Sequence, residues 1–534
     1  MTGNGAEALL TTLVGSGVEV CFANPGTSEM HFVAALDSVA GMRAVLCLFE
    51  GVATGAADGY ARMTGRPAAT LLHLGPGLGN GIANLHNARR AGSPVVNVVG
   101  DHATHHKPFD APLESDIDAL AGAVSGWVRR SGTVAEVGAD AAAAVTAASD
   151  GPSPDDPVLA GGRVATLILP ADVSWSDGAT PGVAAVPAGP TRVPDPAVAA
   201  VATQLQRDAR ATILLGGTAL TEAGLRAASR IAAATGATVL AETFPARLRR
   251  GAGIPAVDRL AYREEDAVRQ LAGTEVMVLA GASAPVAFFA YPGRPSTFTP
   301  PGATTVTLAD READVVDALE RLASQLGGVE VEVPTVPTPP VPTGALTAAN
   351  WSAAVASVWP DAEAIVVDES NTSGMAALPA ATAGCPPHDV LTLTGGAIGI
   401  GLPLAVGAAV ARPDRPVLCL ESDGSAMYTI SALWTHAREH LDVTTVILDN
   451  RSYAILQHEL DRVGAARGGK RAATLLDLSR PDLDFVALAT GMGVPATRAT
   501  TCEALAEQLR AAFTAPGPHL VVAQLNGAAS NGRE

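Results

Sequence analysis

Residues 416–425 read PVLCLESDGS, and residues 444–450 read TTVILDN. Each stretch is a short run rich in Val, Leu, Ile or Thr that ends in polar residues, and the chain between them has the composition of a helix. This order predicts a strand, a helix and a second strand parallel to the first. Asp423 and Asn450, 27 residues apart in the chain, are then expected at the same edge of one sheet.

The same alternation runs through the rest of the chain. Short Val/Ile/Leu runs, such as those at 95–99, 212–215, 276–279 and 365–367, alternate with Ala-rich stretches. Such runs are typical of parallel strands that are buried on both faces. Two Pro-rich stretches, about 177–196 and about 329–343, read as linkers. The prediction is an α/β protein of three doubly wound parallel-sheet domains, at 1–180, 190–330 and 340–534.

Composition excludes several classes of function. The 534 residues have a formal net charge of −18, 48% hydrophobic residues and 4% aromatic residues. An acidic chain repels phosphate backbones, so we expect no nucleic-acid partner and no anionic membrane surface. The five cysteines form no CxxC pair, which argues against a disulfide framework or a structural zinc site. Without a signal peptide or an apolar span, we expect a cytoplasmic protein.

The strand ends at Asp423 and Asn450 suit a metal ion. Carboxylate, amide and main-chain oxygens are the ligands that Mg²⁺ prefers, and Mg²⁺ leaves positions for phosphate oxygens and water. Gly424 and Ser425 begin the predicted helix, where their N–H groups can face a diphosphate. The alternative is an Asp that caps the helix and an Asn in a turn.

These two strand ends resemble the signature of the thiamin-diphosphate-dependent decarboxylase and acetolactate-synthase superfamily. The family has Gly-Asp-Gly and Asn-Asn where this chain has Ser-Asp-Gly and Asp449-Asn450, so both side-chain ligands remain. The resemblance implies that Mg²⁺ is held by Asp423, Asn450 and a main-chain oxygen of Ser452, with Tyr453 also at the cofactor. The stretch SDGSAMYTISALWT from Ser422 resembles the benzoylformate-decarboxylase branch.

The first block carries an independent resemblance. LFEGVATGAADGYARMTGRPA from Leu48 is similar to the catalytic-glutamate segment of the family, with Glu50 as the glutamate after an apolar run. The resemblance implies that Glu50 hydrogen-bonds the cofactor's aminopyrimidine and so favours its activation. CFANPGTSEMHF from Cys21 is similar to a turn that faces the substrate, which implies a cofactor-side role for Thr27. The alternative for Glu50 is a first-turn residue that only stabilises its helix.

Histidines of the first block have two interpretations. His73 follows the run ATLL and stands where the benzoylformate-decarboxylase branch has an active-site histidine, which implies that it donates or accepts a substrate proton. A polar wall residue is the alternative. His102, His105 and His106 have the composition of a metal motif, but no helix fixes their spacing, so we expect a loop at the substrate entrance instead.

The third block begins with two further matches. VVDESNTSGMAA from Val366 is similar to a phosphate-contacting turn, with Asn371 and Thr372 as donors. LTGGAIGIGLPLAVGAA from Leu393 is similar to the segment that grips the aminopyrimidine, which needs glycines such as Gly396 for close backbone approach. There Ile398 stands as the apolar wedge that bends the cofactor. Close helix packing is the alternative reading of these glycines.

The resemblance implies a thiamin-diphosphate- and Mg²⁺-dependent enzyme, a lyase or transferase that acts on a small 2-oxo acid. We expect an acetolactate-synthase-like decarboxylase and carboligase, with an enamine formed at cofactor C2. A simple benzoylformate-type decarboxylase, a 2-hydroxyacyl-CoA lyase and a non-catalytic partner subunit remain alternatives. The usual Gly-rich stretch for FAD is not evident in the middle block, and Phe288 or Phe289 replaces a second catalytic histidine. The family also implies a homodimer or homotetramer whose active sites join two subunits.

Overall fold

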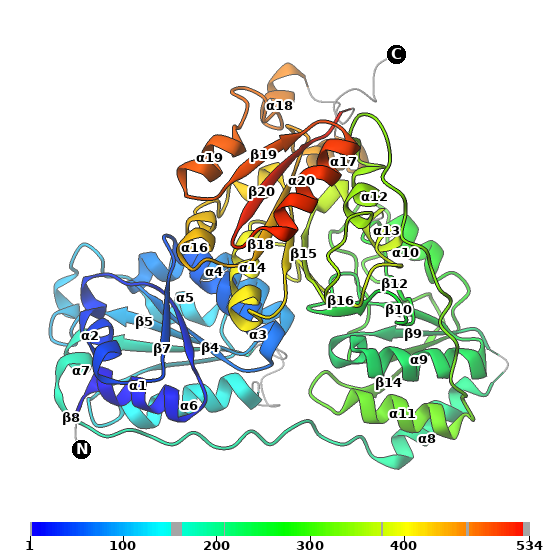
Figure 1. Cartoon of the computed structure of the whole chain (residues 1–534). Coiled ribbons are helices and arrows are strands. Elements are labelled where there is room, and N and C mark those ends of the chain that lie inside the picture. Colours follow the sequence, from blue (N-terminus) through cyan, green and yellow to red (C-terminus); the bar gives the residue numbers. More distant parts are fainter. Residues whose placement is uncertain (1–2, 151–162, 208, 375–376, 466–468, 527–534) are drawn as a thin grey trace.

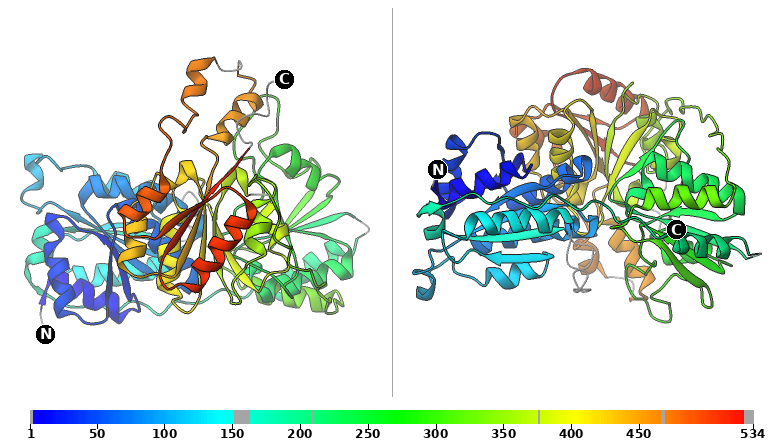
Figure 2. Two further views of the ribbon diagram at one scale, coloured as in Figure 1. Left: turned by 45° about the horizontal axis from the view of Figure 1, so that its top comes forward. Right: turned by 90° about the horizontal axis from the view of Figure 1, so that it is seen from below.

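The computed structural model describes residues 3–150, 163–207, 209–374, 377–465 and 469–526. Three α/β layers form the molecule, and Figure 1 shows the first (blue to cyan) and the central one (green) on either side of the third (yellow to red). Figure 2 shows the same arrangement from two other directions. The family expectation of three α/β domains is confirmed at this level.

The first sheet has six parallel strands in the order β3-β2-β4-β5-β7-β6. They are β2 (Val20–Asn24), β3 (Arg43–Leu46), β4 (Ala68–Leu72), β5 (Val95–Asp101), β6 (Trp127–Arg130) and β7 (Val164–Pro170). The main helices are α1 (Gly5–Gly15), α2 (Met30–Ser38), α3 (Glu50–Thr64), α4 (Leu74–Ala91), α5 (Ile117–Gly122), α6 (Val137–Asp150) and α7 (Ala171–Trp175). Strands β5 and β7 are buried along their whole length, as continuous apolar runs predict.

The central sheet has five parallel strands in the order β12-β10-β9-β13-β14. They are β9 (Ala211–Leu215), β10 (Thr238–Ala241), β12 (Asp258–Arg259), β13 (Val276–Ala280) and β14 (Thr304–Ala309). Its helices are α8 (Asp195–Leu205), α9 (Glu222–Thr235), α10 (Glu264–Gln270) and α11 (Val315–Gln325).

The third sheet has seven strands in the order β11-β16-β15-β17-β18-β20-β19. They are β11 (Leu248–Arg250), β15 (Ile365–Glu369), β16 (His388–Thr392), β17 (Val417–Ser422), β18 (Val443–Asp449), β19 (Ala496–Ala499) and β20 (His519–Gln524). The helices are α12 (Trp351–Ala356), α13 (Ala377–Ala381), α14 (Gly401–Ala411), α15 (Asp423–Ala426), α16 (Ala432–Arg438), α17 (Ala454–Arg462), α18 (Lys470–Thr474), α19 (Phe485–Gly491) and α20 (Cys502–Thr514). Strand β11, from the middle of the chain, joins its edge antiparallel to β16, so this sheet is not purely parallel.

The linker expectations hold only in part. Residues 177–179 form strand β8 (Asp177–Ala179), which pairs with β1 (Gly3–Asn4), and α8 already begins at Asp195. Between them an extended segment runs beneath the molecule from the first layer to the central one (Figure 1). Residues 329–343 carry neither helix nor strand. The loop expected at 151–157 lies outside the described residues.

The first and third layers share one hydrophobic core, and its centre is the contact between α3 and α14. Their backbones approach so closely that a Cβ on Gly407 would lie 1.9 Å from the carbonyl oxygen of Ala56. Beside this contact, the buried Arg62 bonds Asp58 at 2.6 Å. The same guanidinium donates to the Thr392 carbonyl at 2.6 Å and to the Ala246 carbonyl at 3.3 Å, so one side chain connects all three layers.

All five cysteines are buried free thiols, in agreement with the expectation that no disulfide framework exists. Among the described residues, no helix is both long enough and apolar enough to cross a membrane.

Candidate active site

Asp423 and Asn450 lie where the sequence predicts, at the carboxyl ends of the neighbouring parallel strands β17 and β18. Asp423 is buried and begins α15. Its Oδ2 accepts the backbone N–H groups of Asn450 at 3.1 Å and of Arg451 at 2.6 Å, so the carboxylate ties the two strand ends together. The Asn450 amide oxygen accepts the Ser452 N–H at 3.0 Å. Two side-chain oxygens thus meet at one sheet edge.

The surroundings of Asp423 are electrically negative. Burial first, and the charge of Asp449 as well, raise the pKa of its carboxyl to about 6 against the opposing effect of backbone N–H groups. A divalent cation at this edge would favour the ionised carboxylate. The Gly424 N–H, which the sequence assigns to a diphosphate, donates instead to Asp423 Oδ1 at 2.8 Å. Helix α15 also ends after one turn, so the single helix expected between the two strands is divided into α15 and α16.

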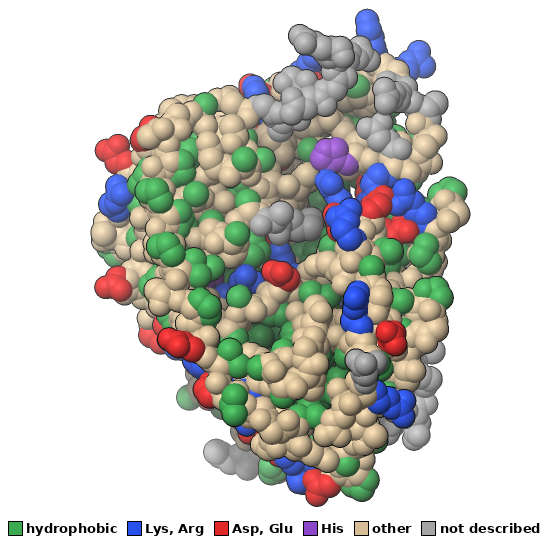
Figure 3. Space-filling view, turned by 90° about the vertical axis from the view of Figure 1, so that its right-hand side faces the viewer, with side chains coloured by type: hydrophobic (Ala, Val, Ile, Leu, Met, Phe, Trp, Pro, Cys, Tyr) green, Lys and Arg blue, Asp and Glu red, His purple; other side chains and the backbone are tan. Residues whose placement is uncertain are grey.

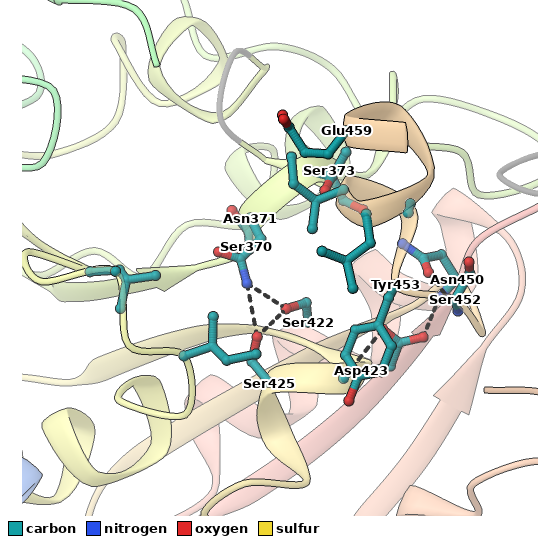
Figure 4. Close-up of a pocket in the computed structure, with 18 of the residues that line it drawn as sticks. Ser370, Asn371, Ser373, Ser422, Asp423, Ser425, Asn450, Ser452, Tyr453 and Glu459 are labelled. Carbon is teal, nitrogen blue, oxygen red and sulfur yellow. Dashed lines mark hydrogen bonds between the residues drawn. The ribbon is translucent and has the colours of Figure 1, made fainter. Parts of the chain in front are cut away.

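A polar network faces the cavity from the adjoining strand ends. The Asn371 amide donates to Ser422 Oγ and to Ser425 Oγ, both at 2.8 Å, and the two hydroxyls lie 2.7 Å apart. Figure 4 shows these groups on one side of the pocket, opposite Asp423, Asn450 and Ser452. Asn371 holds a left-handed backbone conformation with φ 46°, which turns its side chain toward β17. These amide and hydroxyl groups can bind phosphate oxygens.

One cavity of about 460 Å³ collects most of the predicted cofactor residues. Those that line it are Asn371, Thr372, Gly396, Ile398, Asp423, Gly424, Ser425, Asn450, Ser452 and Tyr453. The Tyr453 ring packs on Gly424, where a Cβ would lie 2.4 Å from the ring. An aromatic wall of Phe244, Tyr262, Phe288 and Phe289 closes the outer side, with neighbouring ring centroids 4.9–6.0 Å apart.

A buried carboxylate accepts hydrogen bonds from the backbone of the loop that carries Ile398. Glu369 Oε1 accepts the Gly399 N–H at 2.7 Å, and Oε2 accepts the Gly401 N–H at 2.5 Å. Glu421 stands beside Glu369 on the neighbouring strand, and both are buried. Burial raises the pKa of Glu369 to about 7, and burial together with the Glu369 charge raises the pKa of Glu421 well above its usual range. The pair therefore retains a proton beneath the loop.

Glu50 is the first residue of α3, and the sheet strand before it ends earlier than expected. Strand β3 stops at Leu46 and residues 47–49 intervene, so the apolar run before Glu50 forms a strand only in its first part and Glu50 does not directly follow a strand. Glu50 is 8% exposed, and its carboxylate accepts a hydrogen bond from the Asn80 amide at 3.0 Å. Glu50 thus lies in the first turn of α3, as the alternative interpretation expects, and this position is also compatible with a contact to the cofactor.

His73 directly follows β4, as predicted, and a carboxylate that the sequence analysis did not single out holds its ring. Glu29 Oε2 lies 2.8 Å from His73 Nδ1, and Ser28 Oγ lies 3.3 Å from the same nitrogen. Glu29 is buried and also accepts the Gly26 N–H at 2.7 Å. The only signal in the sequence was its place in the quoted stretch CFANPGTSEMHF. Thr27 begins the same 3₁₀ turn, and its side chain is exposed.

Glu50 and His73 form a second cluster apart from the cavity. Both lie near Gly77, where a Cβ would be 3.0 Å from Glu50 Oε1 and 3.4 Å from His73 Cβ. Among the described residues that line the 460 Å³ cavity, none comes from the first layer. A single chain therefore presents two groups of predicted site residues that do not share a cavity.

The histidines at 102, 105 and 106 lie between β5 and the short helical turn at Lys107–Phe109. His105 is exposed, with Nδ1 3.7 Å from Asp172. Within the described ranges, no three His, Cys, Asp or Glu side chains are arranged to hold a metal ion.

Comparison with known proteins gives a consistent result. Residues 3–121 match the N-terminal TPP binding domain of thiamine pyrophosphate enzymes, and residues 372–523 match the C-terminal TPP binding domain. A Mycobacterium tuberculosis protein named "Putative acetolactate synthase large subunit IlvX" is 61% identical over 520 residues, which cover 97% of this chain and 98% of that protein. The benzoylformate decarboxylase of Pseudomonas aeruginosa is 30% identical and covers 95% of this chain and 96% of its own length.

The fold has close counterparts among solved structures. A thiamine diphosphate-dependent 4-hydroxybenzoylformate decarboxylase from Rhodococcus jostii superposes with a TM-score of 0.82 at 24% identity, covering 98% of this chain and 99% of that chain.

Proposed function

The chain belongs to the thiamine pyrophosphate enzyme family, and from that premise we propose that it is a Mg²⁺-dependent 2-oxo acid decarboxylase that also joins the activated product to a second carbonyl compound. One observation carries the proposal. The oxygen edge of Asp423 and Asn450, the donors around Asn371 and the Ile398 loop line one cavity of about 460 Å³. Each part suits a different portion of the same cofactor.

The residues present fit both absent groups. Asp423, Asn450 and the Ser452 main chain would hold Mg²⁺, because they supply hard oxygens at one sheet edge. Asn371 and Ser425 would hold the diphosphate. When bound, thiamin diphosphate supplies a nucleophilic carbon that attacks the 2-oxo group and accepts the electrons left when CO₂ departs.

Glu50 binds the aminopyrimidine in this proposal. Its carboxylate is buried at the start of α3, with Asn80 fixing one oxygen, so the other oxygen is available for a nitrogen of the cofactor. A buried carboxylate in a fixed orientation makes a stronger hydrogen bond than one in water. Ile398, on the loop held by Glu369, excludes water from the same region and sets the bend of the cofactor.

His73 moves a proton at its Nε2 atom. Glu29 accepts from Nδ1 and so selects the tautomer in which Nε2 carries no hydrogen. Such a nitrogen can accept a proton from the substrate and return it to the product. The Ser28 hydroxyl, 3.3 Å from Nδ1, adds a second contact on the inner side of the ring.

Two subunits complete the site in this proposal. The cluster of Glu50 and His73 and the cavity around Asp423 are complementary halves that one chain does not bring to a common cavity. A second copy would place its first layer over the cavity of the first copy. A homodimer or homotetramer is therefore proposed, and an isolated monomer should have no turnover.

The aromatic wall favours a substrate that has an apolar portion next to its reacting carbon. Phe288 and Phe289 stand where the benzoylformate-decarboxylase branch has a second catalytic histidine, and both line the cavity. They offer no proton-transfer group, so His73 remains the proton-handling histidine of the proposal. A 2-hydroxyacyl-CoA lyase and a non-catalytic partner subunit are the competing functions.

A substrate panel tests the proposal. The purified protein is supplied with Mg²⁺, thiamin diphosphate and a series of 2-oxo acids and 2-hydroxyacyl-CoA thioesters, and CO₂ and products are identified. Release of CO₂ from a 2-oxo acid supports the proposal. Cleavage of thioesters alone favours the lyase, and cofactor binding without turnover of any donor favours the non-catalytic subunit.

A further inference from the structure

A second chamber adjoins the cofactor cavity. It has a volume of about 480 Å³, and Tyr262, Thr372 and Ile455 line both spaces. Its other walls come from the β11–β12 region and α10 of the central layer and from the segment near Pro379. Figure 3 views the molecule from the side of the central layer, where Lys, Arg, Asp and Glu side chains lie around the hollowed middle of the face.

Arg250 is an arginine of this chamber that lacks an acidic partner. Its guanidinium donates to the carbonyls of Val257 at 3.2 Å and Pro379 at 3.5 Å. Among the residues that the structure describes, no carboxylate oxygen lies within 4.0 Å of it. Burial, and after it the charge of Arg259, lowers the pKa of Arg250 to about 10, while the charge of Asp258 opposes the shift. A buried charge without a counter-ion is costly, and the cost is removed when an anion binds.

The second arginine of the chamber increases the positive potential. Arg259 Nη2 lies 3.8 Å from Asp368, and its side chain is only 13% exposed. The chamber also contains Arg263, against the carboxylates of Asp258 and Asp266. Asp266 is paired with Arg269 at 2.8 Å, outside the chamber lining. The chamber lining thus carries three arginines and two carboxylates, a formal charge of +1, in a chain of net charge −18.

The chamber is distinct from the place of the cofactor diphosphate. Of the predicted diphosphate donors, Asn371 and Ser425 line the first cavity and not the chamber, whereas Thr372 lines both. Arg250 and Arg259 line the chamber and not the first cavity. Tyr262 and Thr372 face both spaces, so the chamber and the first cavity meet at these two side chains.

We propose that the chamber of Arg250 and Arg259 binds an anionic oxygen group, a carboxylate or a phosphate, at the far end of the substrate. This proposal rests on the proposed function, which identifies the reacting end of the substrate as a 2-oxo acid. The substrate class is then a 2-oxo acid that carries a second acidic group, separated from the first by an apolar stretch that passes the aromatic wall. Guanidinium groups are suited to this, because they bind carboxylates and phosphates through paired hydrogen bonds.

Kinetics with matched substrates test the proposal. The series 2-oxoglutarate, 2-oxoadipate and 2-oxopimelate is compared with the monoacids of equal chain length. The wild-type protein should prefer at least one diacid, and Arg250→Met should reduce the ratio of kcat/KM for diacid over monoacid by about tenfold to a hundredfold. Arg250→Lys should restore part of the ratio, and Arg269→Met, on α10 outside the chamber, should keep it. An equal ratio in wild type and Arg250→Met overturns the proposal.

A binding measurement separates this proposal from the proposed function. Adipate, hexanoate and inorganic phosphate are titrated calorimetrically into the wild type and Arg250→Met. Tighter binding of adipate than of hexanoate, lost in Arg250→Met, supports the chamber even if no 2-oxo acid is turned over. Binding of phosphate that depends on Arg250, without any preference for diacids, assigns the chamber to a separate ion and overturns the substrate assignment. Because Arg250→Met removes a charge that has no acidic partner, its thermal midpoint should not fall below that of the wild type. The thermal midpoint therefore distinguishes a loss of binding from a loss of folding.

Discussion

Replacement of Glu29 tests how His73 is positioned. Glu29 Oε2 accepts from both the Gly26 N–H at 2.7 Å and His73 Nδ1 at 2.8 Å, whereas Oε1 has no partner among the described residues. Glu29→Gln can place its amide oxygen at the Oε2 position and keep both contacts, but without charge. Since charged hydrogen bonds contribute about 1.5–3 kcal/mol and neutral ones about 1, the loss is about 1.4 kcal/mol, or about tenfold in kcat.

Glu29→Ala removes the acceptor altogether, and His73 loses the contact that selects its tautomer. We expect a fall of about a hundredfold in kcat, from a loss of about 3 kcal/mol, with cofactor affinity unchanged. The assay is steady-state CO₂ release together with fluorescence titration of thiamin diphosphate. Glu19→Gln, an exposed change near the same sheet, is the control and should have wild-type kcat. Wild-type kcat in Glu29→Ala, while His73→Ala is impaired, would refute the positioning role.

Three further predictions concern metal and stability. Removal of divalent ions with EDTA should abolish both turnover and cofactor affinity, and Mg²⁺ should restore them; turnover that persists would exclude the metal site. Asp58→Ala should lower the free energy of unfolding by about 3–5 kcal/mol because it leaves Arg62 buried and unpaired, and the double replacement with Arg62→Met should lose less; additive urea-midpoint shifts would contradict this. Burial lowers the pKa of His436 to about 4, against about 6.5 in the unfolded chain. The free energy of unfolding should therefore be full above pH 6.5 and fall by about 3 kcal/mol as the pH drops toward 4. His436→Gln should flatten the dependence of the urea midpoint on pH in this range, and an unchanged slope would contradict the prediction.

The parts of the site that sequence could predict depend on sheet geometry. Asp423 and Asn450 each end an apolar run, and parallel strands place such ends at one edge, so their proximity follows from local pattern alone. The turn at Asn371 follows from the same rule, since β15 lies next to β17.

The parts that sequence could not predict depend on tertiary packing. Glu421 sits in an apolar strand, and only the register with Glu369 makes it part of a proton-sharing pair. Strand β11 crosses from the middle of the chain to the edge of the third sheet, which no local pattern indicates. Arg250 lies on that strand, and its lack of a carboxylate partner depends on where the strand docks. The early end of β3 at Leu46 likewise reflects pairing with β2 only as far as Ala23.

The central claim is that Glu50 is needed for the reaction of the bound cofactor and not for binding the cofactor. The most direct measurement compares Glu50→Gln with the wild type for thiamin diphosphate affinity and for CO₂ release from the best 2-oxo acid of the panel. The account predicts an affinity that is nearly unchanged, because Asp423, Asn450 and Asn371 hold the metal and the diphosphate, together with a loss of turnover. Wild-type turnover in Glu50→Gln would contradict the account.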